Sequence, residues 1–206
     1  MRDESNIKEV ASLRPDFIGF IFYPPSPRYA AGLKPDIVTS LPKSITPVAV
    51  LVDPELNDIL ELNAKYGFKT FQLHGQETPE FCKELKSHGF EVIKAFRVSS
   101  DNKEDIKGML PKYKGKADLL LFDTAGTAPG GNGYKFDWNI LEEIKSGTPF
   151  LLSGGIEEKD ASGLKDFLPA GCLGVDLNSR FEIEPGLKDT RSLTNFINEF
   201  KYEQAY

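Results

Sequence analysis

The chain has 206 residues, 40% of them hydrophobic and 27% charged, with a formal net charge of −6. These values fit one globular domain spanning residues 1–206, and no apolar run approaches the roughly 18 residues that a membrane helix needs. A negative chain without a basic stripe is a poor partner for nucleic acid. The chain has only two cysteines and two histidines, isolated from one another, so we expect neither a metal site nor a disulfide framework. No signal peptide is visible, so we expect a cytoplasmic location.

The chain opens with a charged, helix-like stretch over residues 4–13, and no strand precedes it. Short apolar runs then recur along the chain. They predict seven strands, over residues 17–22, 48–52, 70–73, 92–96, 119–122, 150–152 and 174–177. These runs are nearly continuous in apolar residues, which is typical of parallel strands buried on both faces.

Amphipathic stretches with helical spacing lie between the strands. One covers residues 54–62, with Asp53 expected to cap it, and another begins at Thr78, a cap residue followed by Pro79. Gly67, Gly89 and Gly115 mark the returns to strand, where a left-handed residue is often needed.

A strand and a helix thus alternate every 20 to 30 residues or so, which is the rhythm of βα units. We expect an α/β fold, a (β/α)8 TIM barrel whose first strand is missing from this chain, leaving seven strands and eight helices. The alternative is an open sheet of seven strands, although no G-x-G-x-x-G follows the first of them.

Functional groups of such a barrel lie where the strands end. Gly154 and Gly155, and the segment with Asp176, Asn178 and Ser179, follow two successive strands. Backbone amides there can hold a phosphate, although the glycines could also serve only tight turns. Asp123 ends a wholly apolar strand and is either a general acid or the cap of a turn. The glycine-rich segment 124–133 that follows could close over a ligand.

Each of the other polar residues at strand ends has two interpretations. Arg28, between Pro27 and Tyr29, could bind a carboxylate or phosphate or be a solvated surface residue. His74 could be an acid or base or a hydrogen-bonded core residue, and without a metal partner the second is the simpler expectation. Arg180 could face the phosphate, but an ion pair with Glu182 is the simpler expectation. Cys82 and Cys172 are expected to be structural.

Several motifs together resemble the phosphoribosylanthranilate isomerase family of tryptophan biosynthesis. They are Gly19-Phe20-Ile21-Phe22 with Ser26-Pro27-Arg28-Tyr29, Phe71-Gln72-Leu73-His74-Gly75, Phe122-Asp123-Thr124, Gly130-Gly131-Asn132-Gly133 before Phe136-Asp137-Trp138, Leu152-Ser153-Gly154-Gly155-Ile156 and Gly174-Val175-Asp176-Leu177-Asn178-Ser179. Each is weak alone, but their order and spacing are specific, and they cover essentially the whole chain.

The resemblance implies an Amadori rearrangement of N-(5-phosphoribosyl)anthranilate to 1-(2-carboxyphenylamino)-1-deoxyribulose 5-phosphate, without a cofactor. Asp123 would be the general acid, and a cysteine would be the base. Arg28, Gln72 and His74 would bind the substrate. Gly154, Gly155, Asp176, Asn178 and Ser179 would hold its phosphate. The partner implied is this phosphosugar, and the protein would be a monomer or a homodimer.

The resemblance fails at the start of the chain. The family begins with a strand ending in Cys-Gly, and this chain begins at Met1-Arg2-Asp3, so the catalytic cysteine is absent and we expect little or no activity from the chain as written. One alternative is a non-catalytic phosphosugar-binding barrel. Another is a different barrel enzyme of the pathway, such as indole-glycerol-phosphate synthase or the tryptophan synthase α subunit, which would need a lysine acid or paired glutamates at strand ends.

Overall fold

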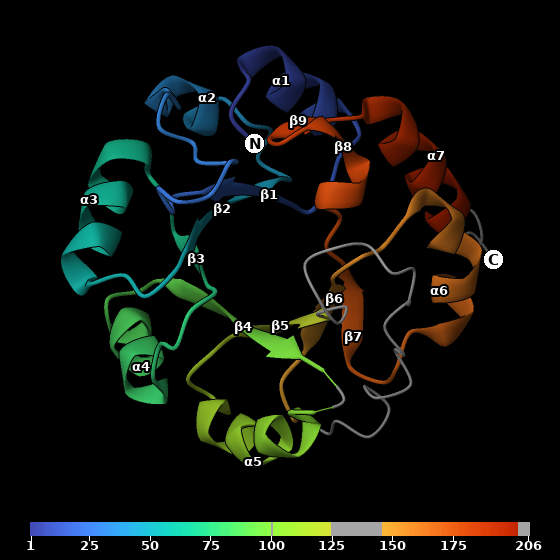
Figure 1. Ribbon diagram of the computed structural model, residues 1–206. Helices are drawn as coiled ribbons and strands as arrows, with labels where there is room; N and C mark the ends of the chain where they lie inside the picture. The colour runs from blue at the N-terminus through green and yellow to red at the C-terminus, as the bar shows by residue number, and fades with distance from the viewer. Residues whose placement is uncertain (100, 125–145, 202–206) are drawn as a thin grey trace.

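The computed structural model describes residues 1–99, 101–124 and 146–201. Seven parallel strands lie at the centre of the molecule and the helices surround them (Figure 1). The strands are β1 (Phe17–Ile21), β2 (Thr46–Leu51), β3 (Thr70–Leu73), β4 (Glu91–Val98), β5 (Leu119–Thr124), β6 (Phe150–Ser153) and β7 (Cys172–Val175). They pair in chain order from β1 to β7, which confirms the seven predicted strands and the βα rhythm.

Helices connect most of these strands. They are α1 (Glu4–Ser12), α2 (Pro35–Thr39), α3 (Leu56–Tyr66), α4 (Pro79–Ser87), α5 (Lys103–Tyr113), α6 (Ala161–Phe167) and α7 (Thr190–Lys201). A short hairpin, β8 (Glu182–Glu184) with β9 (Leu187–Lys188), lies between β7 and α7. Of the eight helices expected, seven lie in the described ranges. Most of the β5–β6 connection, residues 125–145, lies outside them, as does nearly all of the glycine-rich segment expected to close over a ligand.

Local signals in the sequence set several of these boundaries. The Thr78 side chain accepts a hydrogen bond from the Phe81 amide and caps α4, as predicted. Gly67 ends α3 in the left-handed region at φ 78°. The prediction for Asp53 is wrong. Glu55 caps α3, and Asp53, at φ 48°, instead accepts a hydrogen bond from the Gln76 amide in the neighbouring loop.

The alternation of side chains along each strand divides the core in two. Val48, Ile93, Ala95, Leu119 and Leu121 form one buried cluster inside the curved sheet. The alternate residues of the strands, such as Leu120 and Phe122 of β5, pack in the larger cluster with the helices. Asp123 is in phase with Leu119 and Leu121, so its side chain points into the barrel, where it extends the β5 row.

The sheet does not close within the described ranges, because β1 and β7 are not hydrogen-bonded to each other. Phe17 on β1 and Leu173 on β7 are 39% and 69% exposed, large values for strand residues of a barrel. The amine of Met1 donates a hydrogen bond to the Gly19 carbonyl of β1 at 3.0 Å. No helix in the described ranges is both long and apolar enough to cross a membrane.

Candidate functional site

One cavity of about 900 Å³ runs through the interior of the sheet, from the start of β1 and the side of α7 to the carboxyl ends of the strands. Its walls include all nine residues that the sequence predicted for the site. They are Arg28, Gln72, His74, Asp123, Gly154, Gly155, Asp176, Asn178 and Ser179. The cavity therefore brings together residues from the ends of β1, β3, β5, β6 and β7.

Asp123, His74 and Gln72 form a chain of contacts across the barrel mouth. His74 Nε2 lies 3.3 Å from Asp123 Oδ2, and Gln72 Nε2 lies 3.2 Å from His74 Nδ1. An amide nitrogen only donates, so this arrangement assigns the neutral imidazole its Nε2–H tautomer, which donates to the carboxylate. His74 thus contacts Asp123 at the cavity wall, and with its side chain 25% exposed it is not a core residue.

The loop that carries His74 rests on a buried ion pair that the sequence analysis missed. Lys94 Nζ lies 2.7 Å from Glu77 Oε2, and both side chains are 2% exposed. Lys94 also donates to the Gly75 carbonyl at 2.8 Å, and Glu77 accepts the Gly75 amide at 3.0 Å. A β-carbon on Gly75 would lie 2.2 Å from Asp53 Oδ1, so only glycine fits this position. A lysine within the apolar run 92–96 was the available signal.

The β6 and β7 ends form the candidate phosphate loops. Gly154 and Gly155 have φ values of 95° and 64°, which turn the backbone sharply after β6. Ser153 Oγ donates to Asp176 Oδ2 at 2.9 Å and joins the two loops. Burial raises the pKa of the Asp176 carboxyl, and the charge of Asp123 adds to this, while Ser153 and Lys188 oppose it.

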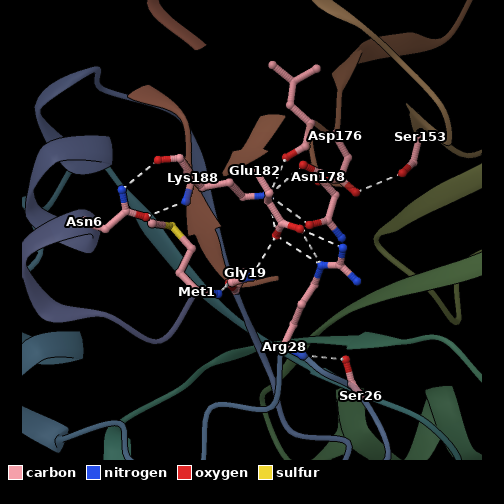
Figure 2. A network of polar contacts seen from close by, with 12 residues as sticks. Met1, Asn6, Gly19, Ser26, Arg28, Ser153, Asp176, Asn178, Glu182 and Lys188 are labelled. Carbon is pink, nitrogen blue, oxygen red and sulfur yellow. Dashed lines mark hydrogen bonds and ion pairs between the residues drawn. The ribbon is translucent and has the colours of Figure 1, made fainter. Parts of the chain in front are cut away.

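Arg28 belongs to a second polar network at the edge of the cavity, shown in Figure 2. Its guanidinium contacts Glu182 through Nε, 2.8 Å from Oε2, and through Nη2, 2.7 Å from the same oxygen. The expected Arg180–Glu182 pair is wrong, because Arg180 lies 3.7 Å from Glu157 instead. Glu182 and Lys188 were missed because the short strands β8 and β9 have no apolar pattern.

Both cysteines lie away from the cavity mouth. Cys82 is fully buried on α4, and burial raises its thiol pKa to about 11. Cys172 begins β7, at the opposite end of the strand from Asp176, and burial also raises its pKa. A thiol that holds its proton is a weak base, so neither cysteine suits proton abstraction here. The described residues contain no cluster of three or more metal-binding side chains.

Comparison with known proteins gives the same family from sequence and from structure. Residues 1–199 match the family described as N-(5'phosphoribosyl)anthranilate (PRA) isomerase. The isomerase of Parabacteroides distasonis is 42% identical over 201 residues, which cover 97% of this chain and 90% of that protein. The Thermotoga maritima isomerase structure superposes with a TM-score of 0.85 at 29% identity, over 98% of this chain and 96% of the other.

A second solved isomerase is similar to this chain and carries a ligand. It was determined in complex with reduced 1-(o-carboxyphenylamino)-1-deoxyribulose 5-phosphate, and it superposes with a TM-score of 0.80 at 28% identity, over 98% of this chain and 95% of the other. Together with the cavity and its row of polar strand ends, these matches identify the fold as the TIM-barrel type of that enzyme. The chain belongs to the N-(5'-phosphoribosyl)anthranilate isomerase family.

Proposed function

We propose that this protein is the isomerase that converts N-(5-phosphoribosyl)anthranilate to 1-(2-carboxyphenylamino)-1-deoxyribulose 5-phosphate, with residues 1–206 acting as one barrel. The observation that carries the proposal is the shared cavity. It places the Asp123 carboxyl and the loops around Gly154 and Asp176 within one space of about 900 Å³. A phosphopentose with an aromatic substituent fits a space of this size.

In the proposed reaction Asp123, in its acid form, protonates the ring oxygen of the ribose. The C1–O bond breaks as the nitrogen lone pair forms a C1=N iminium. A base then removes the proton from C2, the electron pair of the C2–H bond forms the C1=C2 bond of an enolamine, and the π pair of the C1=N bond returns to nitrogen. Tautomerisation gives the C2 ketone and a C1 methylene, so C2 is oxidised while C1 is reduced. The atoms balance with one acid and one base, and no external oxidant is needed.

We assign roles to the remaining site residues from their positions around the cavity. Gly154, Gly155, Asn178 and Ser179 offer backbone and side-chain donors for the phosphate, close to the Asp176 carboxyl. Arg28 faces the same cavity and would bind the carboxylate of the anthranilate, with Gln72 and His74 bordering the sugar.

The catalytic base is the part of the proposed mechanism that the described residues do not supply. Neither Cys82 nor Cys172 lines the cavity, and the wall contains no other thiol within the described ranges. We therefore propose that residues 1–206 alone bind the ligand but turn it over slowly. A thiol carried by an added strand between β1 and β7 would lie across the cavity from Asp123 and supply the base.

Steady-state formation of the ketose product tests this. Three proteins are compared: the chain itself, the chain extended at its amino end by one apolar strand ending in Cys-Gly, and the same extension ending in Ser-Gly. We expect rapid product formation only from the Cys-Gly form. A Cys82→Ser change in that form should leave its rate unchanged. Equal rates of product formation for all three proteins would refute the proposal that the chain lacks its catalytic base.

A non-catalytic phosphosugar-binding barrel is the second candidate, because the candidate phosphate loops need no catalytic base to bind a ligand. If every form binds the reduced product analogue and none forms product, the binding function stands and the isomerase proposal fails. The family match removes the reason to consider the other barrel enzymes of the pathway.

A further inference from the structure

The Arg28 side chain is held in place by a carboxylate that is almost inaccessible to solvent. The Glu182 side chain is 4% exposed and contacts Arg28 at 2.7 and 2.8 Å. Burial alone would raise the pKa of Glu182. The hydrogen bonds from Arg28 and the charges of Lys188 and Arg28 outweigh burial, so the pKa lies below its usual value and the group is a carboxylate. Within the described ranges, the Arg28 side chain contacts Glu182 through Nε and Nη2.

Lys188 joins this carboxylate to the candidate phosphate loop. Its Nζ lies 3.3 Å from Glu182 Oε1 and donates to Asn178 Oδ1 at 2.8 Å and to the Asn178 carbonyl at 3.0 Å. The backbone of Lys188 is anchored in turn by Asn6 of α1, whose side chain accepts its amide at 2.7 Å and donates to its carbonyl at 2.9 Å. Figure 2 shows these contacts as one connected network.

We propose that Glu182 and Lys188 are positioning residues that set the two anion-binding ends of the cavity relative to each other. Glu182 orients Arg28 toward the ligand's carboxylate, and Lys188 ties Glu182 to the Asn178 segment that holds the phosphate. The inference rests on the proposed function, because it assigns a carboxylate and a phosphate to the two ends. A network of largely buried groups that hydrogen-bond to one another suits such a role, since it favours one arrangement, and Arg28, 23% exposed, keeps part of its guanidinium toward the cavity.

Binding measurements with three ligands separate the two ends. The ligands are the reduced product analogue, the same compound with phenyl in place of carboxyphenyl, and inorganic phosphate. Glu182→Gln keeps the size of the side chain but turns one oxygen into a donor facing Arg28. We expect it to weaken the carboxylate ligand about tenfold while leaving the phenyl compound and phosphate within about twofold. Lys188→Gln should weaken all three ligands, since it releases the Asn178 segment.

Glu184→Gln is the matched control. Glu184 lies on the same strand, two residues away, but its side chain is 64% exposed and its ion pair with Arg2 spans 4.0 Å. It should change no affinity. Equal losses for all three ligands in the Glu182→Gln protein, or no loss, would overturn the positioning role.

A measurement without ligand distinguishes failure of this inference from failure of the proposed function. The Arg28 Nε–H proton should give a slowly exchanging NMR signal in the wild-type and Glu184→Gln proteins and exchange rapidly in the Glu182→Gln protein. If the signal behaves in this way but the wild-type chain binds no product analogue, the proposed function is wrong and the Glu182–Arg28 contact is structural only. If the signal exchanges rapidly in the wild-type chain, the positioning inference is wrong.

Discussion

His74 Nε2 lies 3.3 Å from Asp123 Oδ2, although the two residues are 49 positions apart in the chain and β4 lies between their strands in the sheet. Both side chains are 25% exposed, so each keeps one edge open to the cavity. The contact fixes the orientation of the carboxyl that the proposed reaction uses as an acid.

Replacing Asp123 with asparagine should remove the acid and preserve the shape of the site. In whichever of the compared forms turns over the substrate, we expect kcat to fall by about 10² to 10⁴. The affinity for the reduced product analogue should change only a few-fold, because the phosphate and carboxylate contacts remain. Steady-state kinetics and calorimetric binding measure the two effects. His88→Gln, a change at the other histidine, is the control, and a kcat within tenfold of wild type for Asp123→Asn would contradict the assignment.

The Lys94–Glu77 pair should contribute strongly to stability through the loop that carries His74. Lys94→Met leaves the Glu77 carboxylate buried without its cation, which typically costs about 3–5 kcal/mol of unfolding free energy. Urea denaturation measures the loss. Lys86→Met breaks a more exposed pair, with Asp118, and should cost less than about 1 kcal/mol.

Adding Glu77→Gln to the Lys94→Met protein supplies the test of mechanism. The double variant should recover part of the loss, because the uncompensated charge is gone. Strictly additive losses would show that Glu77 is not destabilised by the absence of Lys94.

The stability of the protein should depend on pH through Asp176. Burial raises the pKa of this carboxyl in the folded state, so the folded chain binds more protons than the unfolded chain above the ordinary aspartate range. The contribution of Asp176 is therefore fully present at low pH and is lost as the pH rises through its folded pKa. Unfolding free energies from pH 4 to 8 should show wild type losing stability relative to Asp176→Asn as the pH rises. A difference that grows with pH in favour of wild type would mean that Lys188 and Ser153 stabilise the anion more than burial opposes it.

Sequence alone predicts the features that depend on local pattern. The apolar runs locate all seven strands, and because Asp123 continues the Leu119 and Leu121 row, its place in the barrel follows from strand alternation. The Arg28–Glu182 pair joins residues 154 apart in the chain, and no periodicity reports such a contact. Asp53 was predicted wrongly. Its position before Pro54 predicted a helix cap, but its side chain instead accepts a hydrogen bond from the Gln76 amide in the neighbouring loop.

The two unpaired edges of the sheet lead to a prediction about local stability. Within the described ranges β1 and β7 each pair with one neighbouring strand, whereas β4 pairs with both β3 and β5. The outer edge of β1 has in addition the Met1 amine on its Gly19 carbonyl and an isolated bridge from Ile21 to Tyr29. Local opening requires less free energy where fewer hydrogen bonds and apolar contacts must break, so backbone amides of β1 and β7 should exchange with solvent faster than those of β4. A strand added between them would pair both edges and cover Phe17 and Leu173, which are exposed in the described chain. Hydrogen exchange of the chain and of its extended form should therefore show slower exchange in β1 and β7 on extension, with β4 changed least. Unaltered exchange at both edges in the extended form would mean that the added strand does not enter the sheet, and the proposed position of the catalytic base would fall with it.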